Sequence, residues 1–128
     1  MKATNYVPGG MRALLTAIDN QDWHSLALLL CDDTCYEVSG FAPFRGKHAV
    51  LEYYRHERPI LSGIHTIESI ISEGDSGVCC GRFVGVKKNA ERVDIRFADE
   101  IHFQNFRIRQ RRVYFCQPLL PASTDEEI

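Results

Sequence analysis

The sequence predicts an α+β domain in which helices come first and antiparallel strands follow. Three observations support this class. Apolar residues recur at helical spacing between Met11 and Pro59, apolar and polar residues alternate from Ile64 onward, and short turns rich in Gly, Asn and Asp separate the alternating runs. Helices followed by consecutive hairpins are typical of α+β domains, in which the helices cover the apolar face of the sheet.

Length and composition indicate one domain. The chain has 128 residues, of which 45% are hydrophobic and 25% charged, as in soluble proteins with a sizeable core. We expect a single domain over residues 1–128, with its core at about 11–116 and flexible ends at 1–10 and 121–128. The net charge of -2 gives no general attraction to nucleic acid or to anionic membranes, so we expect neither as a partner.

Several kinds of site and location are disfavoured by missing patterns. The N-terminal segment lacks the apolar stretch of a signal peptide, and no apolar run approaches the roughly 20 residues that span a bilayer, so we expect a cytoplasmic protein. Five cysteines without a CxxC pair favour reduced, buried thiols. Without HxxxH, Cys/His clusters, GxGxxG or GxSxG, the sequence predicts neither a metal site nor a bound cofactor.

Three helices are expected in the first half of the chain. They fall within PGGMRALLTAIDNQDW, NQDWHSLALLLCDD and RGKHAVLEYYRHERP. The first follows the helix breakers at 8–10, Asp22 is the expected N-cap of the second, and Pro59 ends the third. The apolar side chains that give each helix one buried side are Met11, Leu14, Leu15 and Ile18, then Leu26, Leu29 and Leu30, then Val50, Leu51 and Tyr54.

Five strands are expected. They are TCYEVSG in the first half and, after residue 63, IHTIESIIS, VCCGRFVGV, RVDIRFADEIHF and RIRQRRVYF. In the segment 92–103, Asp99 shares its face with apolar residues only, namely Val93, Ile95, Phe97, Ile101 and Phe103. A carboxylate removed from water costs several kcal/mol unless it is paired, hydrogen-bonded or protonated. Asp99 is therefore the first candidate for acid–base chemistry.

The register of the last hairpin decides the partner of Asp99. A three-residue turn, which would place Phe106 at a position that favours glycine, sets Arg111 opposite Asp99, whereas a two-residue turn sets Arg112 there. An arginine opposite would keep Asp99 ionised, as a general base needs, and an apolar pocket alone would favour the protonated, hydrogen-bond-donating acid. The alternative to a catalytic Asp99 is a buried ion pair that takes no part in a reaction.

Segments in both halves of the chain resemble a known family. They are AIDNQDWHSLALLLCDDTCYEVSGFAPFRGKHAVLEYY, EGDSGVCCGRFVG and RFADEIHFQNFRI. They are similar to the SnoaL-like and ketosteroid-isomerase-like proteins of the nuclear-transport-factor-like superfamily, over roughly Met11 to Phe115. The resemblance implies a cone in which a strongly curved antiparallel sheet wraps against three helices and encloses an apolar pocket. It also implies a homodimer that pairs through the outer face of the sheet, and an aspartate at the position of Asp99 that points into the pocket as acid, base or oxyanion partner.

The chain departs from two activities of that superfamily. The proton-shuttling carboxylate of the isomerases is matched by Val38, and their oxyanion tyrosine by Leu14, so steroid isomerisation by that mechanism is not expected. The limonene epoxide hydrolases use an Arg-x-Asp pair and a final-strand aspartate. Here the sequence RVD begins at Arg92 after a different hairpin, Asp94 is expected to face outward, and Val113 replaces the second aspartate, so that chemistry is not expected either.

His65 is the second candidate for proton transfer. It shares its strand phase with Ile67, Ser69 and Ile71, and histidine titrates near neutrality. Dehydratases of the resembling fold combine a strand histidine with tyrosines, which Tyr36 on the first strand and Tyr54 on the third helix could supply. A structural histidine and space-filling tyrosines are the alternatives.

Together these observations predict a cofactor-independent enzyme. We expect acid–base-catalysed cyclisation, isomerisation or dehydration of a hydrophobic, polyketide- or terpenoid-like small molecule. Asp99 and His65 would transfer protons, and the substrate-binding residues would be Tyr36, Tyr54, Arg111, Val38 and Phe97. We expect an anionic substrate group to be held by Arg111 or Arg112. The alternative is a small-molecule-binding or dimeric scaffold module without catalysis.

Overall fold

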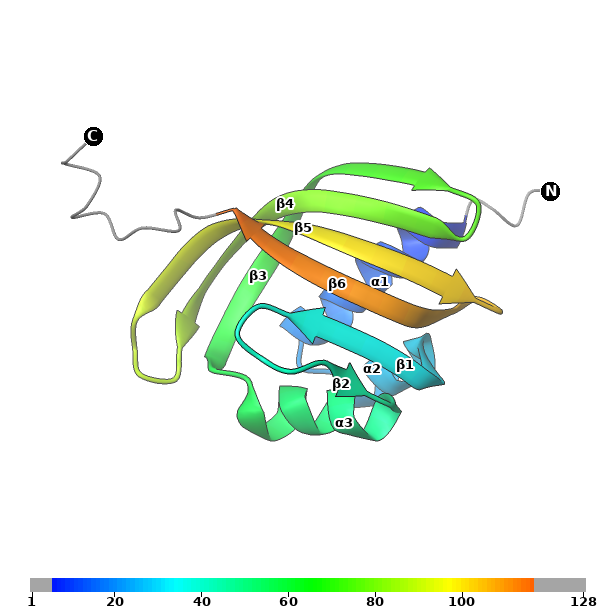
Figure 1. Cartoon of the computed structure of the whole chain (residues 1–128). Coiled ribbons are helices and arrows are strands. Elements are labelled where there is room, and N and C mark those ends of the chain that lie inside the picture. Colours follow the sequence, from blue (N-terminus) through cyan, green and yellow to red (C-terminus); the bar gives the residue numbers. More distant parts are fainter. Residues whose placement is uncertain (1–5, 117–128) are drawn as a thin grey trace.

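A computed structural model describes residues 6–116, and these residues form one curved sheet covered by helices (Figure 1). The helices are α1 (Tyr6–Asp19), α2 (Trp23–Leu29) and α3 (Lys47–Glu52), and α3 continues into a π-helical turn, η2 (Tyr53–Glu57). The strands are β1 (Leu30–Val38), β2 (Phe44–Arg45), β3 (Ile60–Glu73), β4 (Ser76–Lys87), β5 (Arg92–Gln104) and β6 (Arg107–Cys116). The predicted α+β class is confirmed.

The six strands form a single sheet in the order β2-β1-β6-β5-β4-β3. Neighbouring strands are antiparallel, except that β1 and β6 pair in parallel, so the sheet is mixed rather than purely antiparallel as expected. In Figure 1, α1 lies behind the curved sheet and α3 lies below β1 and β2. This arrangement is the predicted cone. None of the helices within residues 6–116 is long and apolar enough to cross a membrane.

Helix α1 begins earlier than predicted. It starts at Tyr6, so the expectation of a flexible end through residue 10 is wrong for 6–10, whereas 1–5 and 121–128 lie outside the described residues. Pro8 lies in the first turn, where its missing N–H is not needed. A Cβ on Gly10 would lie 2.7 Å from the Phe103 ring, so glycine allows the helix to pack closely against β5. Packing on the sheet thus outweighs the local helix-breaking signal.

Helix α2 is shorter than the sequence suggested. Its predicted N-cap is confirmed, because the Asp22 carboxylate accepts a hydrogen bond from the Ser25 N–H at 3.1 Å. Leu30 belongs not to the helix but to β1, where it pairs with Ile108 of β6. The strand therefore begins four residues before the predicted TCYEVSG segment. Parallel pairing with β6 draws Leu30, the last residue of the apolar run LALLL, into the sheet instead of the helix.

The alternation predicted for 92–103 is confirmed. Along β5 the side chains of Phe97, Asp99, Ile101 and Phe103 are buried, and their neighbours are half-buried or exposed. The inward apolar residues belong to one hydrophobic cluster with Met11 and the other buried residues of α1. The outer positions of β5 are largely polar.

Both registers considered for the β5–β6 hairpin are wrong. The turn holds two residues, Asn105 and Phe106, with φ values of 52° and 67°. The three-residue turn for which a glycine-like Phe106 was expected does not form, but Phe106 has a positive φ in the two-residue turn as well, where glycine is also favoured. This turn alone would set Arg112 opposite Asp99.

Beyond the turn, a β-bulge shifts the register of this hairpin by one residue. Phe103 pairs with Ile108 but His102 pairs with Gln110, so Arg109 is the extra residue. As a result Val113 lies opposite Asp99, and Arg111 lies on the same face as Asp99, two residues before Val113. The bulge therefore places an arginine diagonally beside the acid rather than directly across from it.

A second bulge changes the phase of β3. Pairing with β4 shifts between Ile67 and Ser69, so that Ile70 becomes half-buried and Ile71 is 76% exposed. The prediction that His65 and Ile71 share one face is therefore wrong, although His65 and Ile67 do point inward. Simple alternation fails wherever one extra residue enters a strand.

Gly81, beside this bulge, offers a test of the close strand packing. A Cβ at this position would collide with the backbone carbonyl oxygen of Thr66, which cannot swing aside. We expect Gly81→Ala to lower the free energy of unfolding by about 1–3 kcal/mol, as overpacking does. The control is Gly9→Ala in α1, where the new Cβ meets nothing within 4 Å and should raise stability by up to about 1 kcal/mol. Urea unfolding would measure both, and equal effects would contradict the packing argument.

Candidate active site

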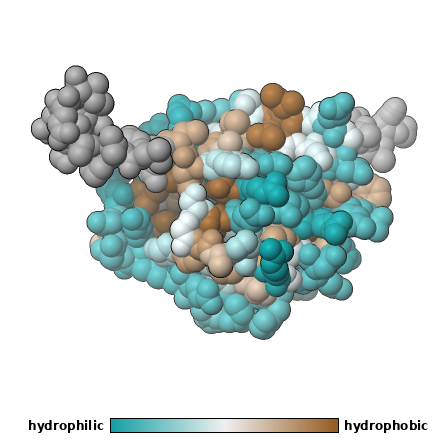
Figure 2. Space-filling view, viewed as in Figure 1, coloured by the Kyte–Doolittle hydropathy of each residue, from teal (hydrophilic) through white to brown (hydrophobic). Residues whose placement is uncertain are grey.

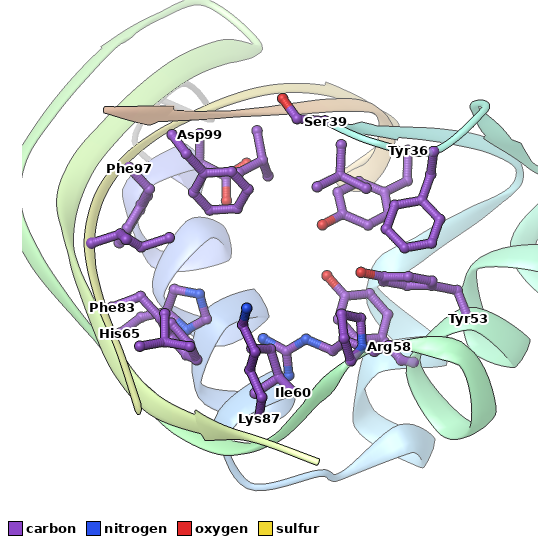
Figure 3. Close-up of a pocket in the computed structure, with 18 of the residues that line it drawn as sticks. Tyr36, Ser39, Tyr53, Arg58, Ile60, His65, Phe83, Lys87, Phe97 and Asp99 are labelled. Carbon is purple, nitrogen blue, oxygen red and sulfur yellow. The ribbon is translucent and has the colours of Figure 1, made fainter. Parts of the chain in front are cut away.

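The predicted site residues all line one cavity inside the cone (Figure 3). The seven are Tyr36, Val38, Tyr54, His65, Phe97, Asp99 and Arg111. Figure 3 shows Asp99 and His65 on the strand side of the open space, and Tyr53 and Arg58 reaching toward it from the other side. The structure thus brings together residues from β1, β3, β5, β6 and the α3–η2 segment. Their chemical roles remain predictions.

Asp99 forms a buried ion pair with Arg111. The Arg111 Nε donates to both carboxylate oxygens at 2.9 and 3.1 Å, and Nη2 donates to Oδ2 at 2.9 Å. Asp99 is only 1% exposed. A guanidinium is always charged, and its donors face both oxygens, so Asp99 is ionised. Arg112, the other candidate partner, instead pairs with Glu37 at 3.2 Å.

Two tyrosines complete the surroundings of Arg111. Its Nη1 donates to the Tyr54 hydroxyl at 2.7 Å, and its Cζ lies 4.5 Å from the centre of the Tyr36 ring. Burial by itself opposes the charge, but the neighbouring Asp99 carboxylate raises the pKa of Arg111 well above its usual value. Because Asp99 already neutralises this charge, Arg111 exerts little attraction on an anionic ligand. The expectation that Arg111 or Arg112 holds such a group gains no support.

Tyr36 and Tyr53 are neutral over a wide pH range. Burial, reinforced by the adjacent Tyr54 hydroxyl, raises the pKa of Tyr53 to about 12 and that of Tyr36 well above its usual value. Their hydroxyl groups therefore keep their protons at physiological pH. They can donate hydrogen bonds to a ligand oxygen but cannot serve as bases there.

His65 is held by a carboxylate from α1. Its Nδ1 lies 2.6 Å from Oδ1 of Asp19, and its backbone N–H donates to Oδ2 at 2.8 Å. A carboxylate can only accept, so Nδ1 carries the proton and Nε2 carries the lone pair in the neutral ring. The ring packs between Phe83 and Phe97, with centroid distances of 4.6 and 5.2 Å.

The Nε2 edge of His65 faces the cavity (Figure 3). Among the described residues it has no hydrogen-bond partner, and it is not a buried polar atom left unsatisfied. It is therefore reachable from the open space. A histidine whose Nδ1 is fixed by a carboxylate and whose Nε2 is free has the arrangement of a general base.

Sequence reasoning missed three residues of this site. Asp19 ends α1, 46 residues before His65, and no local pattern connects the two. Tyr53 is buried together with Tyr54 because the helix widens into η2, where the Arg58 N–H donates to the Tyr53 carbonyl at 2.8 Å. Arg58 itself lines the cavity, and the one available signal was the following Pro59, which favours extended backbone before it.

The cysteines contribute no reactive group to the cavity wall. All five are free, but only Cys79 is buried and Cys116 is exposed, so the prediction of buried thiols holds for Cys79 alone. Burial, with the nearby Asp99 charge, raises the pKa of Cys79 to about 12. Within residues 6–116, no cluster of three or more His, Cys, Asp or Glu side chains has the arrangement of a metal site.

Solved structures of similar fold carry several activities in their names. An LEH-like epoxide hydrolase of M. tuberculosis has 23% identity and a TM-score of 0.79, with 89% of this chain and 85% of that chain covered. A proposed SnoaL-like polyketide cyclase from Jannaschia sp. CCS1 has 9% identity and a TM-score of 0.79, with 91% and 90% covered. A proposed isomerase from Rhodopseudomonas palustris has 22% identity and a TM-score of 0.73, with 91% and 92% covered.

At these identities the likeness establishes the fold alone. The fold is that of the nuclear-transport-factor-like proteins, among which are an epoxide hydrolase and proteins named as cyclases and isomerases. No functionally curated protein matches this sequence. The SnoaL-like domain family matches residues 11–111, which is most of the chain. The chain therefore belongs to the SnoaL-like domain family.

Proposed function

We propose that the protein is an acid–base enzyme, independent of a cofactor, that removes a proton from carbon in a hydrophobic, polyketide- or terpenoid-like carbonyl compound. The observation that carries this proposal is the His65–Asp19 pair, with Nδ1 fixed at 2.6 Å and Nε2 free at the cavity. Phe83 and Phe97 beside the ring provide apolar walls for such a compound.

In this mechanism Nε2 of His65 takes the proton from a carbon next to the carbonyl group. The electron pair of the C–H bond moves to the carbonyl oxygen, which becomes an enolate. The Tyr54 hydroxyl accepts from Arg111, so its own proton is available for that oxygen. The Asp19 carboxylate stabilises the positive imidazolium that forms.

The three reaction types differ in the step that the enolate undergoes next. Return of the proton to another carbon gives isomerisation, and delivery to a departing hydroxyl group gives dehydration. Attack of the carbanion on a second carbonyl group of the same molecule gives cyclisation. In all three His65 alternates between base and acid, so one site serves each outcome.

Asp99 has a different part in this proposal from the one the sequence suggested. Both of its oxygens accept hydrogen bonds from Arg111, and neither is free for a substrate proton. We assign it the positioning of Arg111, which in turn orients Tyr54. Asp99 as the base is the competing assignment, and it requires Arg111 to release the carboxylate.

A second candidate function is small-molecule binding without turnover. The ion pair favours it, because Asp99 matches the catalytic aspartate of the resembling cyclases and isomerases and is here occupied by Arg111. The cavity would then serve only as a ligand site. The two candidates differ in whether a bound carbonyl compound loses a proton.

Proton exchange with solvent distinguishes these candidates without knowledge of the final product. Tetralone, indanone and menthone would be incubated with the protein in D₂O, and proton NMR would follow the loss of the signals next to the carbonyl group. We expect faster deuterium incorporation than in buffer for at least one compound. Thermal stabilisation of the protein by these ketones without any incorporation would instead support the binding function.

We also propose that a second copy of the chain covers the outer face of the sheet. Two cross-strand pairs of exposed apolar side chains lie there, Ile64 with Val84 and Ile71 with Val78. Figure 2 shows hydrophobic side chains along the upper edge of this view, over β3, and hydrophilic ones over the middle of the face. Burial of an exposed apolar strip is a common reason for association.

Light scattering after size exclusion tests this association. We expect a dimer for the unchanged protein and a monomer for Ile71→Lys, because a buried unpaired charge would oppose the contact. Leu28→Lys is the matched control, since Leu28 is 58% exposed on α2, away from the sheet. A dimer that survives Ile71→Lys as well as Leu28→Lys would place the interface elsewhere.

A further inference from the structure

The charges at the cavity are paired except for two arginines, Arg58 and the exposed Arg92, which form no ion pair with a side chain of residues 6–116. Arg111 is neutralised by Asp99, and His65 faces Asp19. At the rim, the Lys87 ammonium lies 3.2 Å from a carboxylate oxygen of Glu91. The remaining rim charges are the exposed Asp94, which accepts two hydrogen bonds from Arg82, and the exposed Arg92.

Arg58 differs from Arg92 because its side chain is half-buried rather than exposed. It lines the cavity, is half-buried, and makes no ion pair with any side chain among residues 6–116. Its Cζ lies 5.3 Å from the centre of the Tyr54 ring and 5.6 Å from that of the Phe83 ring. Figure 3 shows its side chain extended toward the middle of the open space, next to Lys87.

The backbone fixes this orientation. The Arg58 N–H donates to the Tyr53 carbonyl across the π-helical turn, and ψ of 129° turns the chain out of the helix before Pro59. Contact with two ring faces compensates part of the lost hydration of the guanidinium. A charge-assisted hydrogen bond to an anion inside the cavity would satisfy the rest.

We infer that Arg58 binds a carboxylate group of the substrate. This inference deepens the proposed function and rests on it, because it names the substrate class of the same cavity. A carboxylate matches the single half-buried cation that lacks a partner among residues 6–116. A phosphate monoester, with about -1.5 to -2 charges, would leave negative charge uncompensated beside Asp99 and Asp19.

The position of Phe83 limits the distance between the carboxylate and the reacting carbon. The centre of the Phe83 ring lies 5.6 Å from Cζ of Arg58 and 4.6 Å from the centre of the His65 ring. A ligand that spans Arg58 and His65 therefore lies across this ring. The inferred substrate is a hydrophobic keto acid whose carboxylate is a few bonds from the C–H group that loses its proton.

A matched pair of probes tests this inference. 3-Benzoylpropionate and its methyl ester share the ring and the ketone, and only the acid carries a charge. Calorimetric titration of the full-length protein at pH 7 should show the acid binding about ten- to hundredfold more tightly than the ester. Arg58→Gln should remove this preference by weakening the acid alone.

Two further variants serve as the control, Arg55→Gln, and as the conservative substitution, Arg58→Lys. Arg55→Gln removes an equal charge from the exposed side of η2 and should leave the preference unchanged. Arg58→Lys should retain part of it, and if Arg58→Gln fails to fold, Arg58→Lys and the salt dependence of acid binding replace it. Equal affinity of the two probes, no binding of the acid at millimolar concentration, or a preference that persists in Arg58→Gln would overturn the inference.

The design separates this inference from the proposed function. Binding is measured without turnover, and the acid preference should survive in His65→Gln. A preference that depends on Arg58, combined with no deuterium incorporation into any ketone, would refute the enzyme and keep the carboxylate site. Incorporation into neutral ketones without an acid preference would keep the enzyme and refute the site.

Discussion

His65→Gln is expected to slow deuterium incorporation into a responsive ketone by about 10²- to 10⁴-fold, the usual contribution of a general base. Glutamine retains an N–H donor for the Asp19 carboxylate, so the end of α1 should stay in place while the basic nitrogen is lost. The measurement is the initial exchange rate by proton NMR, with thermal unfolding to verify that the fold is intact.

His56→Gln is the control for this substitution. His56 lies on η2 with its side chain 66% exposed, and its loss should not change the exchange rate. Asp19→Asn extends the test: it should lower kcat more than it raises KM, because it alters the proton position on His65 rather than a substrate contact. An unchanged rate in His65→Gln would exclude His65 as the base and return that role to Asp99.

Asp99→Asn is expected to lower the free energy of unfolding by about 3–5 kcal/mol, because Arg111 would remain buried without a counter-charge. Asp94→Asn is the matched control. It breaks an aspartate–arginine pair of similar geometry, but with both side chains at least half exposed, so the loss should stay below about 1 kcal/mol. Urea unfolding compares the two variants, and similar losses would contradict the role of burial.

The double variant Asp99→Leu with Arg111→Met separates structure from chemistry. It removes both charges together, and most of the stability lost in Asp99→Asn should return. If the exchange rate returns with it, the pair is structural. If stability returns and exchange does not, the pair takes part in the reaction, either through Asp99 as a base or through the hydrogen bond that Arg111 donates to Tyr54.

The last hairpin shows why the placement of Asp99 was predictable and its partner was not. Alternation along 92–103 depends only on the two-residue repeat of a strand, and it correctly placed Asp99 inside. The partner depends on the turn length and on the bulge at Arg109, which together moved Arg111 diagonally beside Asp99. A bulge is a property of two paired strands, so one strand's sequence does not reveal it.

The sequence by itself determined the α+β class, the order of the helices and of every strand except the short β2, the family resemblance and seven of the residues that line the cavity. These follow from local periodicity and from motifs read along the chain. Only the tertiary structure decided which charges are paired. Asp19 reaches His65 across 46 residues, Arg111 rather than Arg112 meets Asp99, and Arg58 is left facing the cavity. Such pairings depend on how elements far apart in the sequence pack against one another, and a short stretch of sequence does not predict that packing.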